Sequence, residues 1–217
     1  MFERDLTSNA LLGEYMDRLT LEQKHAQFTE FFMIKHELPV NLSLKADDFT
    51  LPEVDDLHQH MPYEFQIASE LSSIDTKALR PLRGLGEHAI ELADFLNQQS
   101  RKIDLMMSLI LQQHATQEDT YHSLEFGGGG IIIQCPSEWT IGSIAELKLF
   151  LREEASAIFC FAEVIACKLE DDKYHVSLIF TRIREEDQDL LVKASLHIQA
   201  ANLRKRKTLE KNKIEKN

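Results

Sequence analysis

The sequence has few cysteines, and their spacing indicates neither a disulfide framework nor a zinc site. Its 217 residues include three of them, Cys135, Cys160 and Cys167, which is an odd number at unsuitable intervals. Each lies in or beside an apolar run, so we expect reduced core residues. The N-terminus lacks an apolar signal segment, and no run approaches the roughly 20 apolar residues of a membrane-spanning helix. The sequence therefore predicts a soluble, cytoplasmic protein.

Positive charge is also scarce over most of the chain. Lys and Arg number 24 against 36 Asp and Glu, which gives a formal net charge of −12. This acidic balance argues against nucleic acid, or an anionic membrane, as the main partner. The exception is residues 204–217, with seven basic and two acidic side chains. Two interpretations stay open there: a solvated helix end whose cations suit the helix dipole, or a basic arm for an acidic partner.

The patterns expected of an enzyme are missing as well. The sequence shows no paired nucleophile and base, no metal-ligand spacing, and no carboxylate pair whose placement it reveals. Hydrophobic residues make up 43% of the chain and charged residues 28%, so a sizeable core is expected rather than disorder. We therefore expect a folded, non-catalytic protein without a metal site.

Residues 1–75 are predicted to form a mainly helical N-terminal region with an acidic linker. A capping box that begins at Thr20 predicts the start of a helix, and Pro39 predicts its end. The acidic stretch 46–56 is predicted to be the linker. Between them, three apolar residues alternate with polar ones and indicate a short strand: Val40, Leu42 and Leu44.

Residues 76–115 carry the clearest periodic signal in the chain. Spacings of three and four alternate over about four heptads, which is typical of a coiled coil. The stripe is wider than a two-residue seam, which favours a tetramer over a dimer, or packing against the N-terminal helices. The alternative is an amphipathic helix buried in its own subunit. The predicted oligomerisation positions are Leu82, Leu85, Ala89, Leu92, Leu96, Gln99, Ile103, Met106 and Ile110.

From about residue 116 the period changes from that of a helix to that of strands. Short alternating segments joined by turns, with a hairpin turn at Asp171-Asp172, predict a small antiparallel barrel. A final amphipathic helix is expected over Glu185–Lys207, because acidic residues fill its first turn. Residues 116–207 would thus form one unit, and 208–217 a basic tail.

Four consecutive glycines at 127–130 interrupt the strand region. A glycine run exposes backbone N–H groups to which an anion can bind. A P-loop, however, needs a following Lys and Ser or Thr and then a helix, whereas three isoleucines follow here. The dinucleotide fingerprint fails for the same reason. The structural alternative is a bulge or a sharp bend at a barrel corner.

The residues around this run resemble a family motif. Glu125-Phe126-Gly127-Gly128-Gly129-Gly130 resembles the Asp/Asn-x-Ser-x-x-Gly motif of bacterial PilZ domains, with Glu125 and Gly127 as departures and Gly130 as a match. The order of the later elements agrees over about residues 117–207. These are a turn glycine, a Glu-Val strand, a Tyr-x-Val-x-x-x-Phe strand and an acid-started helix: Gly142, Glu163-Val164, Tyr174–Phe180 and Glu185–Lys207.

The resemblance implies an α+β fold: N-terminal helices, a long coiled-coil helix, and a six-stranded antiparallel PilZ-like barrel with a C-terminal helix. PilZ domains bind the bacterial second messenger cyclic di-GMP, which an upstream Arg-x-x-x-Arg element clamps with two guanidinium forks. This sequence lacks that element. It is most similar to atypical members with a degenerate motif and a heptad helix before the barrel.

We therefore expect a bacterial signalling or adaptor protein that forms a homo-oligomer and recruits a protein partner not identified by the sequence. It should need no cofactor and should not bind cyclic di-GMP tightly by itself. Two alternatives stay open. One is a cyclic di-GMP receptor with a non-standard site at Glu125, Gly127 and Gly130. The other is a coiled-coil scaffold with an inert barrel.

Overall fold

The computed structural model describes residues 15–16, 18–78, 96, 98–100, 102–103, 106–107, 110, 120–151 and 156–214. The predicted heptad positions Leu82, Leu85, Ala89 and Leu92 lie outside them. The N-terminal part contains α2 (Leu21–Glu30), β1 (Met33–Lys35), β2 (Pro39–Leu44), η1 (Val54–Asp56), α3 (Leu57–His60) and α4 (Tyr63–Ala78). The C-terminal part contains β3 (Thr120–Gly127), β4 (Gly130–Cys135), β5 (Ile144–Leu151), β6 (Ser156–Glu170), β7 (Lys173–Arg182) and α6 (Glu185–Ile214).

Six strands close into an antiparallel barrel. Their order around the ring is β3-β2-β5-β6-β7-β4, and the pairing of β3 with β4 completes it. The short strand β1 pairs with the glycine end of β3, while β2 pairs with the other end of β3. The predicted six-stranded barrel is therefore confirmed. Residues 116–207 supply five of its strands, and β2, from the predicted N-terminal region, supplies the sixth.

Strand alternation and irregularities explain how the ring closes. Apolar side chains of β2, β4, β5, β6 and β7 point inward and fill the barrel. The longest strand, β6, carries two register shifts against β7, between Phe161 and Ala162 and between Val164 and Ala166. Such bulges bend a strand and let a small barrel close. Asp171 and Asp172 have φ of 49° and 60°, as a two-residue hairpin turn requires.

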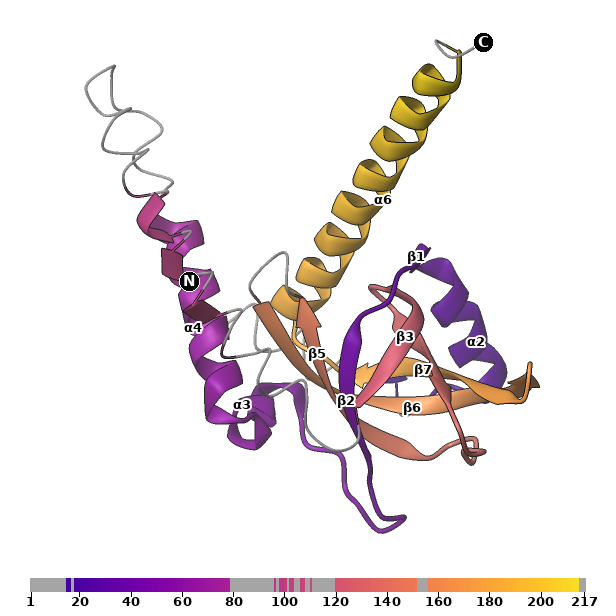
Figure 1. The fold of residues 1–217 in the computed structure, drawn as a ribbon. Helices are drawn as coiled ribbons and strands as arrows, with labels where there is room; N and C mark the ends of the chain where they lie inside the picture. The colour runs from indigo at the N-terminus through magenta and orange to yellow at the C-terminus, as the bar shows by residue number, and fades with distance from the viewer. Residues whose placement is uncertain are drawn as a thin grey trace.

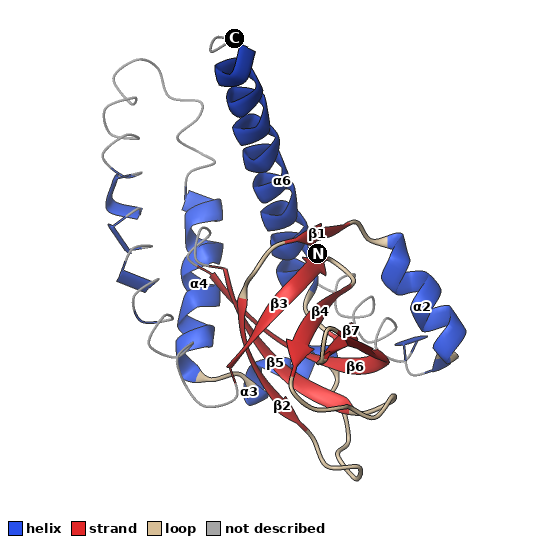
Figure 2. Cartoon of the chain, turned by 45° about the vertical axis from the view of Figure 1, so that its right-hand side comes forward, coloured by secondary structure: helices blue, strands red, loops and turns tan. Residues whose placement is uncertain are grey.

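Helices cover the barrel on separate sides. α6 packs Leu191, Ala194 and Ile198 against the barrel core, and α3 and α4 cover aromatic residues on the outer face of β5 and β6. Figure 1 shows α4 and α6 extending to the same side of the barrel, with α2 against another side, and Figure 2 shows the same arrangement after rotation. None of the described helices is both long and apolar enough to cross a membrane.

The first predicted helix is correct at its start and wrong at its end. Thr20 caps α2, with both hydrogen bonds of the capping box to Gln23 present. The helix ends at Glu30 instead of continuing to Pro39, because the chain after Phe31 pairs with β3 as β1. Strand pairing within the fold overrides the local helical pattern here. The predicted C-terminal helix is confirmed, and it continues beyond Lys207 to Ile214.

Candidate functional site

The predicted motif residues lie at one end of the β3–β4 hairpin. Gly127 ends β3 and Gly130 begins β4, so the four glycines form the turn between the two strands. All four are buried, whereas Glu125 on β3 is partly exposed and has Lys35 of β1 with its Nζ 3.9 Å from the carboxylate. The hairpin thus brings the three residues together. The glycine turn, residues 127–130, is nevertheless not open to solvent.

Side chains of this chain fill the space over the glycine turn. A Cβ atom at Gly128 would lie 2.7 Å from Val192 of α6 and 3.0 Å from the ring of Phe31, and one at Gly129 would lie 2.6 Å from that ring. At Gly130 it would meet the carbonyl oxygen of Leu178 and the ring of Phe28. Glycine is required here because the phenylalanines of the α2 segment pack directly on the backbone. The turn is a packing surface rather than an open anion cradle.

Polar contacts hold the covering helices in place. Lys24 of α2 donates to the Glu163 carboxylate on β6 at 2.5 Å, and both side chains are largely buried. The Gln188 amide of α6 donates to the Gly128 carbonyl at 2.9 Å. Phe28 itself packs with Met16, Ile165 and Ile179 in a small core of its own. Both α2 and α6 are therefore fastened over the glycine turn.

A buried ion pair fixes the start of α6. The Arg184 guanidinium donates to both carboxylate oxygens of Asp187, at 2.7 and 2.9 Å, and to the Ser69 hydroxyl of α4 at 2.9 Å. Burial raises the pKa of Asp187 to about 6, although the neighbouring Arg184 opposes the shift. The nearby Arg182 donates to the Pro52 and Thr181 carbonyls. These two arginines therefore tie α4, α6 and the acidic loop to the barrel.

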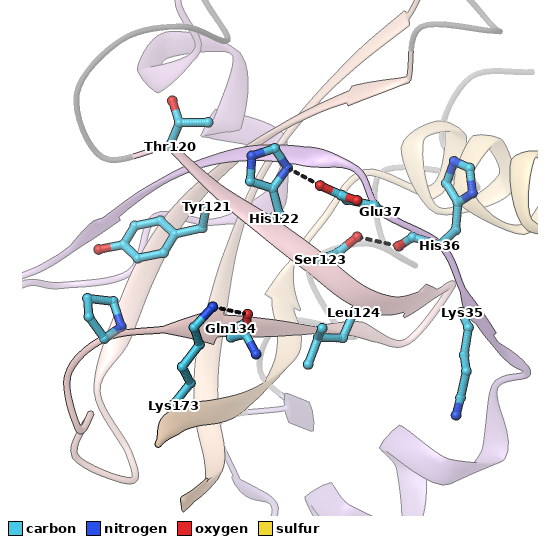
Figure 3. Close-up of a pocket in the computed structure, with 11 residues that line it drawn as sticks. Lys35, His36, Glu37, Thr120, Tyr121, His122, Ser123, Leu124, Gln134 and Lys173 are labelled. Atoms are coloured by element: carbon cyan, nitrogen blue, oxygen red, sulfur yellow. Dashed lines mark hydrogen bonds and ion pairs between the residues drawn. The ribbon is translucent and has the colours of Figure 1, made fainter. Parts of the chain in front are cut away.

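A polar groove lies at the opposite end of the same hairpin. It encloses about 710 Å³ along Thr120–Leu124, with Lys35, His36 and Glu37 on one side and Gln134 and Lys173 on the other (Figure 3). The His122 Nδ1 lies 3.1 Å from the Glu37 carboxylate. The Lys173 ammonium donates to the Gln134 side-chain oxygen at 3.0 Å. We call this feature the hairpin groove.

The predicted oligomerisation face is partly described. The described residues between 96 and 110 are helical. Leu96, Ile103, Met106 and Ile110 are 37%, 39%, 58% and 42% exposed, whereas Met107, at the edge of the same stripe, is 7% exposed and packs in the aromatic cluster beside α4. Among the described residues of this segment, Met107 therefore rests on the barrel, four of the five heptad positions are exposed, and Gln99 is half-buried.

Sequence reasoning missed the hairpin groove altogether. Its lining comes from β1, the β1–β2 connection, β3, β4 with the residue after it, and the start of β7, so no local spacing links those residues. The alternation of β3 and β4 would have predicted which side chains share an outer face, but not that Lys35 and Lys173 flank it. Among the described residues, no group of three or more His, Cys, Asp or Glu is placed to hold a metal ion.

Sequence comparisons find no counterpart for this chain. No family model matches it, and no curated protein matches it. Solved structures do match. One is a pathogenic protein of Xanthomonas campestris, described as a tetrameric PilZ domain self-assembled through an unusual helical bundle. It is 16% identical over 82% of this chain and 96% of that chain, with a TM-score of 0.48, and it agrees with the resemblance predicted from the sequence.

Two further solved structures match a smaller part of the chain. The inhibitor of motility MotI (DgrA) of Bacillus subtilis is 22% identical over 38% of this chain and 42% of its own, with a TM-score of 0.36. MrkH of K. pneumoniae is 18% identical over 40% of this chain and 41% of its own, with a TM-score of 0.35. Likenesses of this size carry no conclusion about a ligand or a partner.

Proposed function

We propose that this chain is a non-catalytic bacterial signalling or adaptor protein, in which a PilZ-like barrel is held in a homo-oligomer by the helix around residues 82–110. A tetramer is favoured over a dimer because the apolar stripe is wide. The barrel does not bind cyclic di-GMP tightly by itself, and the assembled surface recruits a protein partner. The protein works in the cytoplasm.

The exposure of the heptad positions carries this proposal. Leu96, Ile103, Met106 and Ile110 recur at spacings of three, four and seven, and all four are exposed in the single chain. An exposed apolar stripe of this kind marks an interaction site. Heptad spacing allows the helix to pack against a second helix with the same spacing. Met107, on the edge of the stripe, anchors the segment to its own barrel. The remaining face is then free for other copies.

The covered glycine turn supports the weak-binding part of the proposal. The Phe32 backbone and the Met33 side chain occupy the space beside Gly127, and Phe28 occupies the space beside Gly130, so a ligand has no room there. The guanidinium groups of Arg182 and Arg184 are engaged in contacts with the loop, α4 and α6. Hydrogen bonds to charged groups contribute roughly 1.5–3 kcal/mol each. Lacking two arginine forks thus costs on the order of a hundred- to ten-thousand-fold in affinity.

Light scattering coupled to gel filtration tests the self-association. At tens of micromolar we expect about four chains per particle for the unmodified protein. The double variant Leu96→Asp, Ile103→Asp should run as a monomer with an unchanged circular dichroism spectrum, because it would bury unpaired charge in the seam. Ile141→Asp is the matched control, since Ile141 is 51% exposed but lies in the β4–β5 loop. It should remain a tetramer.

Other outcomes separate the alternatives. A monomeric unmodified protein would contradict the proposal, and so would a double variant that assembles as before. An assembled protein that binds cyclic di-GMP tightly would favour a receptor with a non-standard site. Substitutions on the barrel surface could leave the binding of a partner to the assembled protein unchanged. That result would favour the scaffold with an inert barrel.

A further inference from the structure

One lysine of the hairpin groove has a neutral partner. Lys24 of α2, Lys45 and Lys148 each have a carboxylate oxygen within 3.1 Å. Lys173 instead has the neutral Gln134 as its partner, and no carboxylate of the described residues lies within ion-pair distance of it. Glu170, Asp171 and Asp172 lie beside Lys173 at this hairpin, but the ammonium group itself contacts a neutral amide and is available to an anion.

The rest of the lining includes a second ammonium group and two imidazoles. Lys35 flanks the groove, its ammonium group 3.9 Å from Glu125, and His36 and His122 also line it. The single carboxylate in the lining, Glu37, contacts His122. Two ammonium groups, those of Lys35 and Lys173, thus accompany one carboxylate in the lining. An ammonium group is a compact point charge that suits phosphate or carboxylate oxygens without a fixed orientation.

A rigid wall shapes the groove. Where the chain bends between β1 and β2, the buried Ser123 hydroxyl donates to the His36 carbonyl at 2.7 Å and accepts from the Leu38 N–H at 2.9 Å. Backbone bonds from Ser123 to Leu38 and from His36 to Leu124 secure the same bend. Because this bend places Lys35 and Glu37 beside β3, the wall is formed before any ligand arrives. Preformed walls lower the ordering cost of binding.

We propose that the hairpin groove binds a small, multiply charged oxyanion, carried as a phosphate or as a carboxylate. Its volume of about 710 Å³ lies within the range of small-molecule sites. Lys173 contacts one charged group of the ligand, and Lys35 contacts another. Tyr121, stacked edge-on against Trp139 at 5.8 Å, provides an apolar face at one end. The site is separate from the glycine turn and does not depend on the function proposed above.

Equilibrium dialysis of the full chain against radiolabelled pyrophosphate tests the site, with labelled citrate as the carboxylate arm, both at constant ionic strength. We expect one anion bound per chain. Lys173→Gln should weaken binding about five- to tenfold, because it removes one charge-assisted contact. Glu37→Gln should strengthen it about two- to threefold, because it removes the carboxylate of the groove. Lys168→Gln, on the same β6–β7 hairpin but outside the lining, is the matched control and should not change it.

The two anions distinguish the source of the charge. Binding of pyrophosphate alone identifies a phosphate ligand, binding of citrate alone identifies a carboxylate ligand, and either supports the proposal. Absence of binding of both at millimolar concentration would overturn it. Equal losses in Lys173→Gln and Lys168→Gln would also overturn it, because the attraction would then be diffuse charge rather than a site. All three variants alter exposed side chains, so thermal unfolding should show each of them folded.

Discussion

The two ends of the β3–β4 hairpin form opposite kinds of surface. At the turn, four glycines remove all side chains, and Phe28, Phe31 and Val192 fill the vacated space. At the open end, polar side chains line a groove of about 710 Å³. The bend between β1 and β2, which forms one wall of this groove, is fixed by the hydrogen bonds of Ser123. One end is therefore closed by packing, and the other is held open by hydrogen bonds.

This difference shows that a glycine run is not sufficient to identify an anion site. Glycines permit close approach by any group, and here the approaching groups are the rings of the α2 segment. The end with lysines and imidazoles carries no recognisable sequence pattern. The predictions below test each end separately, and they run from the largest expected effect to the smallest.

Gly130→Ala should strongly destabilise the turn. Its Cβ would meet the backbone oxygen of Leu178 and the ring of Phe28. A backbone atom in a sheet can move only if strand hydrogen bonds are distorted, which destabilises the fold. We expect a loss of about 4 kcal/mol in the free energy of unfolding, measured by urea denaturation at fixed protein concentration. Gly142→Ala is the control: it has φ of +90° and open space around it, so backbone strain alone should cost about 1 kcal/mol. Equal losses would show that packing does not explain the glycines.

Asp187→Asn tests the anchor that holds α6 over the turn. The pKa of Asp187 in the folded protein, about 6, lies above its ordinary value of 3.8, so the folded state binds the proton more tightly than the unfolded state. Stability from this group is therefore greatest below about pH 4 and falls as the pH rises to about 6. The asparagine does not titrate. The stability of the wild type minus that of the variant should thus decrease by about 3 kcal/mol from pH 4 to pH 7. A difference that is flat or increases with pH would contradict the assignment.

A double-mutant cycle tests why Gly129 is glycine. The three heavy atoms nearest to a Cβ there all belong to Phe31, at 2.6, 3.1 and 3.3 Å. Gly129→Ala should cost about 2 kcal/mol in the wild-type protein and less than about 0.5 kcal/mol when Phe31 is already alanine. Chemical denaturation of the four proteins measures the coupling. If Gly129→Ala still lowers the free energy of unfolding by about 2 kcal/mol without the Phe31 ring, the glycine is needed for a reason other than the packing of Phe31.

Ser123→Ala tests the bend at the open end. The change leaves the His36 carbonyl and the Leu38 N–H without their hydroxyl partner, and we expect a cost of about 1 kcal/mol because water can reach the groove. That corresponds to a decrease of roughly 2–4 °C in the melting temperature for a chain of this size. Ser137→Ala, an exposed serine in the next loop, should leave the melting temperature unchanged. If Ser123→Ala left the melting temperature unchanged, the hydroxyl of Ser123 would not be needed to stabilise the bend.

Elements with strong local signals were predictable from the sequence. The capping box at Thr20, the Asp171-Asp172 turn, the alternating strands and the acidic start of α6 each depend on neighbouring residues. The strand containing Val40 was also predicted, but its place in the barrel was not. Residues 45–119 separate it from β3, and local alternation does not identify partners across such a gap.

The features that decide function depend on contacts between distant segments. The end of α2 at Glu30 follows from the pairing of β1 with β3, which lies some 90 residues further along. The covering of the glycine turn depends on Phe28, Phe31 and Val192 meeting there. The hairpin groove likewise combines residues from near 35, 122, 134 and 173. Sequence periodicity contains no information on these encounters.

Titration calorimetry with cyclic di-GMP tests most directly the claim that the glycine turn is closed. With the full chain at physiological ionic strength and micromolar ligand, we expect no measurable heat, because Phe28 and Phe31 fill the turn and the sequence lacks the Arg-x-x-x-Arg element. A receptor that carries both arginines serves as the positive control. Submicromolar binding that is lost on substitution of Glu125 would contradict the account and would make this end of the hairpin the ligand site.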